Sequence, residues 1–177
     1  PRISRHLAAA ISGTHGKTTT TSMVSHILLA GDCDPTISVG GILPAIGGNI
    51  RVGNSETFVT EACEYTNSFL SFFPNISIIL NMDADHLDFF KDIDDIRHSF
   101  RRFAELLPAD GTLIINADTP KYEDIIRDLP CNVITYGLEH DADYQAADIT
   151  YDKYGHASFS VLRNGVKVGS YYLKVPG

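Results

Sequence analysis

A glycine-rich loop near the amino terminus carries the residue types that a bound phosphate requires. It reads Gly13-Thr14-His15-Gly16-Lys17-Thr18 and is followed by Thr19. Glycines let backbone N–H groups approach a phosphate, a lysine contacts the outer phosphates, and a threonine hydroxyl binds Mg²⁺. The spacing departs from GxxxxGK[ST], in which a glycine would replace Ile11. The context favours a phosphate site over an ordinary glycine turn, because an apolar strand is expected before the loop and a helix after it.

Acidic and imidazole side chains follow two further expected strands. Glu61 stands at the end of one strand, with Glu64 three residues later, and the run Asn81-Met82-Asp83-Ala84-Asp85-His86 follows another. Open parallel sheets bind ligands at the carboxyl ends of their strands. We therefore expect Glu61 and His86 to lie near Lys17, and Glu61 to bind the Mg²⁺ of a nucleotide. Lys17 and His86 are the candidate catalytic residues, and His86 is expected to bind a second Mg²⁺ or to orient the transferred phosphoryl group. Glu64 is the weaker metal candidate, and a solvated carboxylate or a loop histidine is the alternative interpretation of these residues.

Strands and helices alternate along most of the chain. This order predicts an α/β fold with a mainly parallel, P-loop-type sheet flanked by helices. The glycine-rich stretch 40–53 is interpreted as a loop. The expected strands are 7–12, 36–39, 58–60, 76–80, 112–115 and 132–136, and the expected helices are 18–30, 92–107 and 119–129.

A different pattern begins after residue 137. Asn164-Gly165 lies between two stretches, 157–162 and 166–173, that are typical of strands. This dipeptide is a strong signal for a two-residue hairpin turn. We predict a small antiparallel β subdomain over residues 138–175.

Composition narrows the classes of partner. The 177 residues carry a net charge of −8, with 22 acidic against 14 basic residues, and so disfavour nucleic acid. No apolar stretch approaches the roughly 20 residues that span a bilayer, and no leader is evident, so we expect a cytoplasmic protein without a membrane partner. The three cysteines, Cys33, Cys63 and Cys131, form no CxxC pair and are interpreted as reduced core residues.

Taken together, the runs Gly13–Thr21, Glu61–Glu64 and Asn81–Asp88 resemble the Mur ligases of peptidoglycan synthesis. The resemblance covers essentially the whole chain. It implies that residues 1–177 form the central ATPase domain of a three-domain enzyme. Neither terminus resembles a natural start or stop, which fits a fragment of that kind.

The resemblance also implies roles for particular residues. Lys17 contacts the outer phosphates of ATP, Thr18 and Glu61 bind a first Mg²⁺, and His86 helps to bind a second. Asn81 and the loop residues from Gly13 to Thr19 belong to the same ATP site. The chain departs from the family at one point. Several members carry a carbamylated lysine that binds Mg²⁺ on the helix after the motif that ends in His86, whereas the nearby basic residues here are Arg101 and Arg102, which cannot be carbamylated. That role is therefore not transferred.

The reaction implied by the resemblance is ATP-driven amide formation through an acyl phosphate. The GTHGKTTTT loop, Gly40-Gly41 and the E-A-x-E motif favour the branch that joins L-alanine to UDP-N-acetylmuramate. The branch that recycles murein tripeptide shares much of this pattern and stays open. Both substrates are expected to bind through other domains, so the fragment alone is expected to be inactive.

Three alternatives have different sequence signatures. Folylpolyglutamate synthases share the fold but favour a GTNGKxS loop, which His15 contradicts. A regulatory NTP-binding switch would bind nucleotide without ligase activity. A pure interaction module is disfavoured, because three polar clusters are expected to converge on one sheet edge.

Overall fold

The computed structural model describes residues 7–176, so the predicted domain 1–177 extends past the described residues at both ends. The chain divides into two compact units. The first comprises the residues up to Ile114 together with Glu123–Val133, and the second comprises Ile115–Tyr122 and the residues from Ile134 onward.

The sheet of the first unit confirms the predicted mainly parallel arrangement. Its strands lie in the order β6-β5-β1-β4-β2-β3. The central strand β1 pairs in parallel with β4 and β5, and β4 pairs in parallel with β2, whereas the edge strand β3 runs antiparallel to β2. The strands are β1 Leu7–Ser12, β2 Thr36–Leu43, β3 Gly48–Arg51, β4 Thr57–Glu61, β5 Ile76–Ile79 and β6 Thr112–Asn116.

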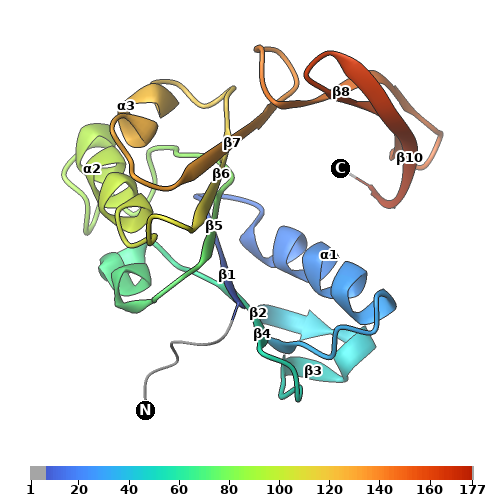
Figure 1. Cartoon of the computed structure of the whole chain (residues 1–177), viewed down its shortest axis with the longest axis horizontal. Coiled ribbons are helices and arrows are strands. Elements are labelled where there is room, and N and C mark those ends of the chain that lie inside the picture. The colour runs from blue at the N-terminus through green and yellow to red at the C-terminus, as the bar shows by residue number, and fades with distance from the viewer. Residues whose placement is uncertain (1–6, 177) are drawn as a thin grey trace. The chain divides into compact units, whose positions relative to one another are not determined.

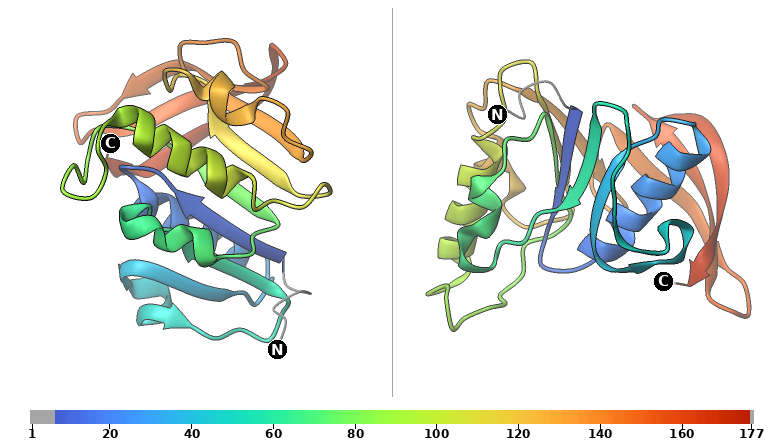
Figure 2. Two further views of the ribbon diagram at one scale, coloured as in Figure 1. Left: turned by 90° about the vertical axis from the view of Figure 1, so that its left-hand side faces the viewer. Right: turned by 90° about the horizontal axis from the view of Figure 1, so that it is seen from below.

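Helices cover both faces of this sheet, with α1 (Lys17–Ala30) on one face and α2 (Ile93–Ala104) on the other (Figures 1 and 2). The carboxylate of Asp92 begins α2 by accepting hydrogen bonds from the N–H groups of Asp94 and Asp95. Asp94 and Asp95 form the acidic first turn of this helix. The shorter helical segments are η1 Pro44–Ile46, η2 Tyr65–Ser71 and α3 Tyr122–Ile126. Within residues 7–176, no helix has the length and apolar character needed to cross a membrane.

An aromatic cluster packs η2 against α2. The ring of Phe69 stacks on Phe103 with centroids 4.6 Å apart and meets Phe100 edge to face at 5.4 Å. All three side chains are fully buried. Because η2 follows directly on the segment from Glu61 to Glu64, this core contact fixes the chain that leaves the carboxyl end of β4.

Two sequence expectations about elements are wrong. The stretch 40–53 is not one loop, because β2 continues through its glycines to Leu43 and β3 pairs back on it. The helix expected over 119–129 shortens to α3. Lys121 and Asp128 both adopt left-handed backbone angles, with φ of 62° and 54°, which interrupts helical geometry on either side of α3.

The second unit carries the predicted antiparallel sheet at the carboxyl end. Strand β8 pairs in parallel with β7, and β8, β9 and β10 pair antiparallel in turn. The predicted turn joins β9 to β10, with φ of 49° at Asn164 and 77° at Gly165, as a type I′ hairpin needs. The sequence did not single out β8 as a separate strand. The bounds are β7 Asn132–Gly137, β8 Tyr144–Tyr151, β9 His156–Arg163 and β10 Val166–Pro176.

One carboxylate organises the turn after β7 in this unit. Asp118 accepts hydrogen bonds from the N–H groups of Leu138, Glu139 and His140, at 2.6, 3.1 and 2.9 Å, and lies 2.9 Å from Nδ1 of His140. Burial acts to raise the pKa of Asp118, but the hydrogen bonds from Leu138 and His140, then Glu139, outweigh it and lower the pKa to about 2. The ionised carboxylate therefore stabilises the folded turn.

Replacing this carboxylate gives a pH-dependent loss of stability. Because the folded pKa lies below the unfolded value, the contribution of Asp118 is present above about pH 4 and is lost as the pH falls toward 2. We expect Asp118→Asn to lower the free energy of unfolding by about 1 to 2 kcal/mol at pH 7. Urea titrations followed by circular dichroism should show the difference shrinking between pH 4 and pH 2. The exposed control Asp110→Asn should match wild type, and a difference for Asp118→Asn that is independent of pH would contradict the assignment.

Candidate phosphate-binding site

The loop between β1 and α1 requires glycine at two positions. Gly13 has φ of 144°, and a Cβ atom there would lie 2.9 Å from Cβ of Leu80. Gly16 has φ of 82° and occupies the N-cap position of α1. L-residues rarely adopt either angle, so these glycines let the backbone pass against the end of β5 and then turn into the helix.

The segment after β5 anchors this loop. The side-chain oxygen of Asn81 accepts a hydrogen bond from the N–H of His15 at 2.8 Å, and its amide nitrogen donates to the carbonyl of His15 at 3.0 Å. The N–H of Thr14 donates to the carbonyl of Asn81 at 3.2 Å, and Oγ1 of Thr14 accepts from the N–H of Asp83 at 2.9 Å. The two motifs that the sequence placed at one sheet edge are therefore directly bonded.

The amino end of α1 is suited to an anion. Gly16 provides no side-chain cap, and the first turn contains no acidic residue. Thr18 and Thr19 are exposed there, and Lys17 is the first helical residue. Helix N–H groups and the helix dipole favour negative charge at such an end. The residues present therefore fit a phosphate group.

Glu64 lies between Lys17 and His86. The ammonium of Lys17 donates to the carbonyl of Gly13 at 2.6 Å and lies 3.0 and 3.2 Å from the two carboxylate oxygens of Glu64. Nε2 of His86 lies 3.8 Å from Oε1 of the same carboxylate. Glu64 is 2% exposed. The structure thus brings Lys17 and His86 together around a residue that the sequence ranked behind Glu61.

Glu61 and Thr18 both border the glycine pair of β2. Oε1 of Glu61 accepts a hydrogen bond from the N–H of Gly40 at 2.6 Å. A Cβ atom on Gly41 would lie 3.3 Å from Cγ2 of Thr18. Across the described part of the chain, no three His, Cys, Asp or Glu side chains are grouped as metal ligands. Thr18 and Glu61 offer oxygen atoms of the kind that bind Mg²⁺, and an Mg²⁺ that arrives on a nucleotide takes only one or two protein ligands.

Neighbouring side chains hold His86 in place. Its backbone is left-handed, with φ of 51°, and Asp85 accepts a hydrogen bond from its N–H at 2.7 Å. The imidazole lies on the ring of Tyr65, with centroids 4.7 Å apart. The hydroxyl of Tyr65 donates to Asp88 at 2.8 Å, and this hydrogen bond raises the pKa of Tyr65. Sequence reasoning missed Tyr65, because an aromatic residue after a strand carries no chemical signal by itself.

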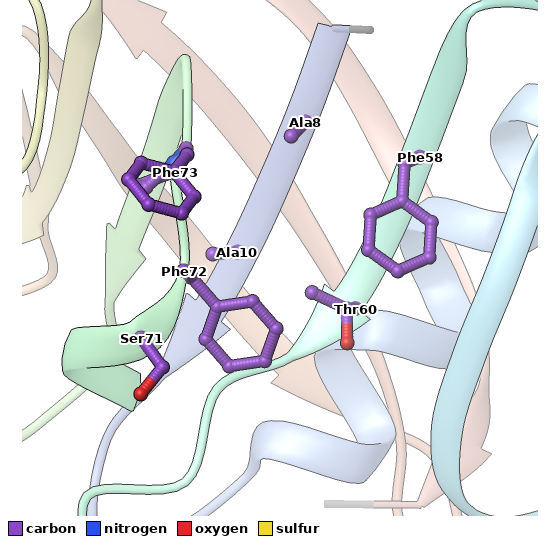
Figure 3. Close-up of a pocket in the computed structure, with 8 residues that line it drawn as sticks. Ala8, Ala10, Phe58, Thr60, Ser71, Phe72 and Phe73 are labelled. Carbon is purple, nitrogen blue, oxygen red and sulfur yellow. The ribbon is translucent and has the colours of Figure 1, made fainter. Parts of the chain in front are cut away.

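A separate hollow opens elsewhere in the first unit (Figure 3). Its volume is about 120 Å³ and its walls are mainly apolar. A nucleotide needs a larger pocket with convergent polar groups, and none of the lining residues belongs to the glycine loop. The hollow is therefore not the phosphate site. Its walls are Ala8, Ala10, Phe58, Thr60, Ser71, Phe72, Phe73 and Pro74.

The fold and the site together define a P-loop-type α/β domain: its central strand leads into a glycine loop, and a lysine begins the helix that follows. Comparison with family models makes the class specific. The chain belongs to the Mur ligase family, because the model of the Mur ligase middle domain matches residues 11–177.

Curated relatives carry the name UDP-N-acetylmuramate–L-alanine ligase. The protein of that name from Lachnospira eligens is 63% identical over 171 residues, which cover 96% of this chain and 37% of the relative. The one from Caldanaerobacter subterraneus subsp. tengcongensis is 54% identical over 168 residues, which cover 95% of this chain and 36% of that relative. This chain therefore spans little more than a third of the length of these relatives.

Solved structures of family members share the fold. UDP-N-acetylmuramate–alanine ligase from Thermotoga maritima is 29% identical, with a TM-score of 0.83 over 99% of this chain and 38% of that one. The UDP-N-acetylmuramate:L-alanyl-γ-D-glutamyl-meso-diaminopimelate ligase from Neisseria meningitidis is 27% identical, with a TM-score of 0.86. The match covers 99% of this chain and 58% of that one.

Adding one methyl group at Gly13 tests the geometry of the loop. We expect Gly13→Ala to lower the melting temperature by several degrees and to weaken nucleotide binding at least tenfold, because the methyl group meets Leu80 and the backbone angle is strained. Differential scanning calorimetry and equilibrium binding of ADP measure both effects. At Gly48 a Cβ atom would meet nothing within 4 Å, so Gly48→Ala is the matched control. Wild-type behaviour of Gly13→Ala would show that the loop conformation is different.

Proposed function

We propose that the full-length protein carrying this chain joins L-alanine to UDP-N-acetylmuramate in a reaction driven by ATP. This chain supplies the site for ATP and Mg²⁺ as the central domain of a cytoplasmic enzyme, with residues 138–175 as its small β subdomain. The observation that carries the proposal is the uncapped amino end of α1, with Lys17 at its first position, in a chain 63% identical to a named L-alanine ligase.

The residues of the site have separate tasks in this reaction. The N–H groups at the start of α1 and the ammonium of Lys17 bind the outer phosphates of ATP, while Asn81 keeps the loop in position. Thr18 and Glu61 would bind a first Mg²⁺, and His86 would help to bind a second. The bound metal neutralises charge on the phosphates.

The reaction itself balances in two displacements. The carboxylate of UDP-N-acetylmuramate attacks the γ-phosphorus of ATP, which forms an acyl phosphate and releases ADP. The amine of L-alanine then attacks the acyl carbon, loses a proton and displaces inorganic phosphate. Such transfers depend on positioning and charge neutralisation, which the loop, lysine and metal ligands provide. Both organic substrates approach from parts of the protein outside this chain, so the chain alone is expected to be inactive.

A murein tripeptide in place of L-alanine is the second candidate. The ligase from Neisseria meningitidis, whose name includes the tripeptide, matches this fold with a TM-score of 0.86, against 0.83 for the alanine ligase from Thermotoga maritima. The fold of the central domain therefore does not separate the two acceptors. The high identity to relatives named for L-alanine favours L-alanine.

Substrate dependence of phosphate release tests the reaction. With full-length protein, ATP and UDP-N-acetylmuramate, we expect inorganic phosphate to appear in a coupled assay only when L-alanine is also present. The tripeptide should replace L-alanine poorly, because the proposal assigns the amine to a single amino acid. Preference for the tripeptide would favour the second candidate, and release that is independent of both organic substrates would indicate an NTP-hydrolysing switch.

Removing the ammonium of Lys17 tests the site. We expect Lys17→Ala to lower ligase turnover by about 10³-fold or more, because the charge that steadies the transferred phosphoryl group is lost. Acyl-phosphate formation, trapped by hydroxylamine, should fall in parallel. Lys167 is exposed on β10, so Lys167→Ala is the control. Substantial turnover by Lys17→Ala would reject the assignment.

A further inference from the structure

Beyond these assignments, we infer that Glu64 is a positioning residue that holds Lys17 and His86 for phosphoryl transfer, while its charge opposes nucleotide binding. The inference rests on the proposed function, because it takes the ligand to be a nucleoside triphosphate. It assigns to Glu64 a role distinct from that of a metal ligand, which is the role foreseen for Glu61.

Glu64 is buried and paired with Lys17. Its side chain is 3% exposed, and both carboxylate oxygens lie within hydrogen-bonding distance of the Lys17 ammonium. A buried carboxylate is costly unless it is paired, and removal of one partner leaves an uncompensated charge. Glu64 and Lys17 therefore depend on each other for their placement, although they lie 47 residues apart in sequence.

The ammonium of Lys17 already has hydrogen-bond acceptors. An ammonium has three donors, and Lys17 directs them to the carbonyl oxygens of Gly13 and Thr14, at 2.6 and 3.3 Å, and to the carboxylate of Glu64. Its side chain is 16% exposed. A phosphate that binds this ammonium must therefore share or displace an existing acceptor. The carboxylate is the one acceptor of the three that carries a full negative charge, so it is the one that repels the phosphate.

His86 also lies close to Glu64. Its Nε2 lies 3.8 Å from the Glu64 carboxylate, and the centroid of its ring lies 4.7 Å from that of Tyr65. Glu64 thus faces both Lys17, which was assigned to the outer phosphates, and His86, which was assigned to Mg²⁺. Its loss should free the lysine charge for the nucleotide and, at the same time, loosen the alignment of both side chains. Nucleotide affinity and turnover are then expected to change in opposite senses.

Glu64→Gln in the full-length protein separates these two effects. The amide keeps the size and a hydrogen-bond acceptor but removes the charge. We expect the dissociation constants of ATP and ADP, measured by calorimetry with EDTA and again with Mg²⁺, to fall on the order of tenfold because the repulsion is removed. We expect kcat to fall by about tenfold or more because alignment is lost. Glu56 is exposed in the loop before β4, so Glu56→Gln is the matched control and should leave both quantities unchanged.

A second variant keeps the test decisive if Glu64→Gln folds poorly, which thermal unfolding would report. Glu64→Asp restores the charge with a shorter reach, so nucleotide affinity should stay within about threefold of wild type while kcat falls. If Glu64→Gln binds the nucleotides more weakly than wild type with Mg²⁺ but not with EDTA, Glu64 is a metal ligand and the inference is overturned. Unchanged affinity together with unchanged kcat would also overturn it. If the wild-type protein binds no ATP, the proposed function fails and this inference fails with it.

Discussion

The hydrogen bonds between the loop after β1 and the segment after β5 fix the site on which every other assignment depends. The side-chain amide of Asn81 bonds to both the N–H and the carbonyl of His15. Thr14 bonds to the backbone of the two residues that flank Met82. Because β1 and β5 are parallel neighbours, their carboxyl ends meet, and short side chains are sufficient for these bonds. The same segment carries His86, so one set of contacts places both the loop and the imidazole.

The candidate site contains few positive charges, in a chain whose net charge is −8. The attraction for an anion comes from one lysine and from backbone N–H groups, and a buried carboxylate already partners the lysine. A phosphate group that binds here would thus meet an ammonium that is already paired. Glu64 stands at the N-cap of η2, the segment whose Phe69 ring stacks on Phe103 of α2. The packing of Phe69 therefore reaches the site through the backbone of one short segment.

Features that depend on neighbouring residues were predictable from the sequence. The order of strand, glycine loop and helix, the acidic first turn of α2 and the hairpin at Asn164-Gly165 all follow from local backbone preferences. Features that depend on tertiary contacts were not. The central place of Glu64 arises from burial against residues far along the chain. The extent of β2 depends on pairing with β3, which outweighs the preference of its glycines for loops. The left-handed backbone at Lys121 and Asp128 shortens α3, although neither residue is a glycine.

The glycine pair of β2 has a consequence for the edge of the sheet. Pairing between β2 and β3 is irregular between Ser38 and Leu43. Within that interval the N–H of Gly40 donates to the side-chain carboxylate of Glu61, the last residue of the neighbouring strand β4. A cation that draws this carboxylate away leaves the Gly40 amide without that acceptor. Binding of a cation would then change the hydrogen bonding of β2 where its pairing with β3 is already irregular. Amide exchange at a single glycine would become a local reporter of occupancy.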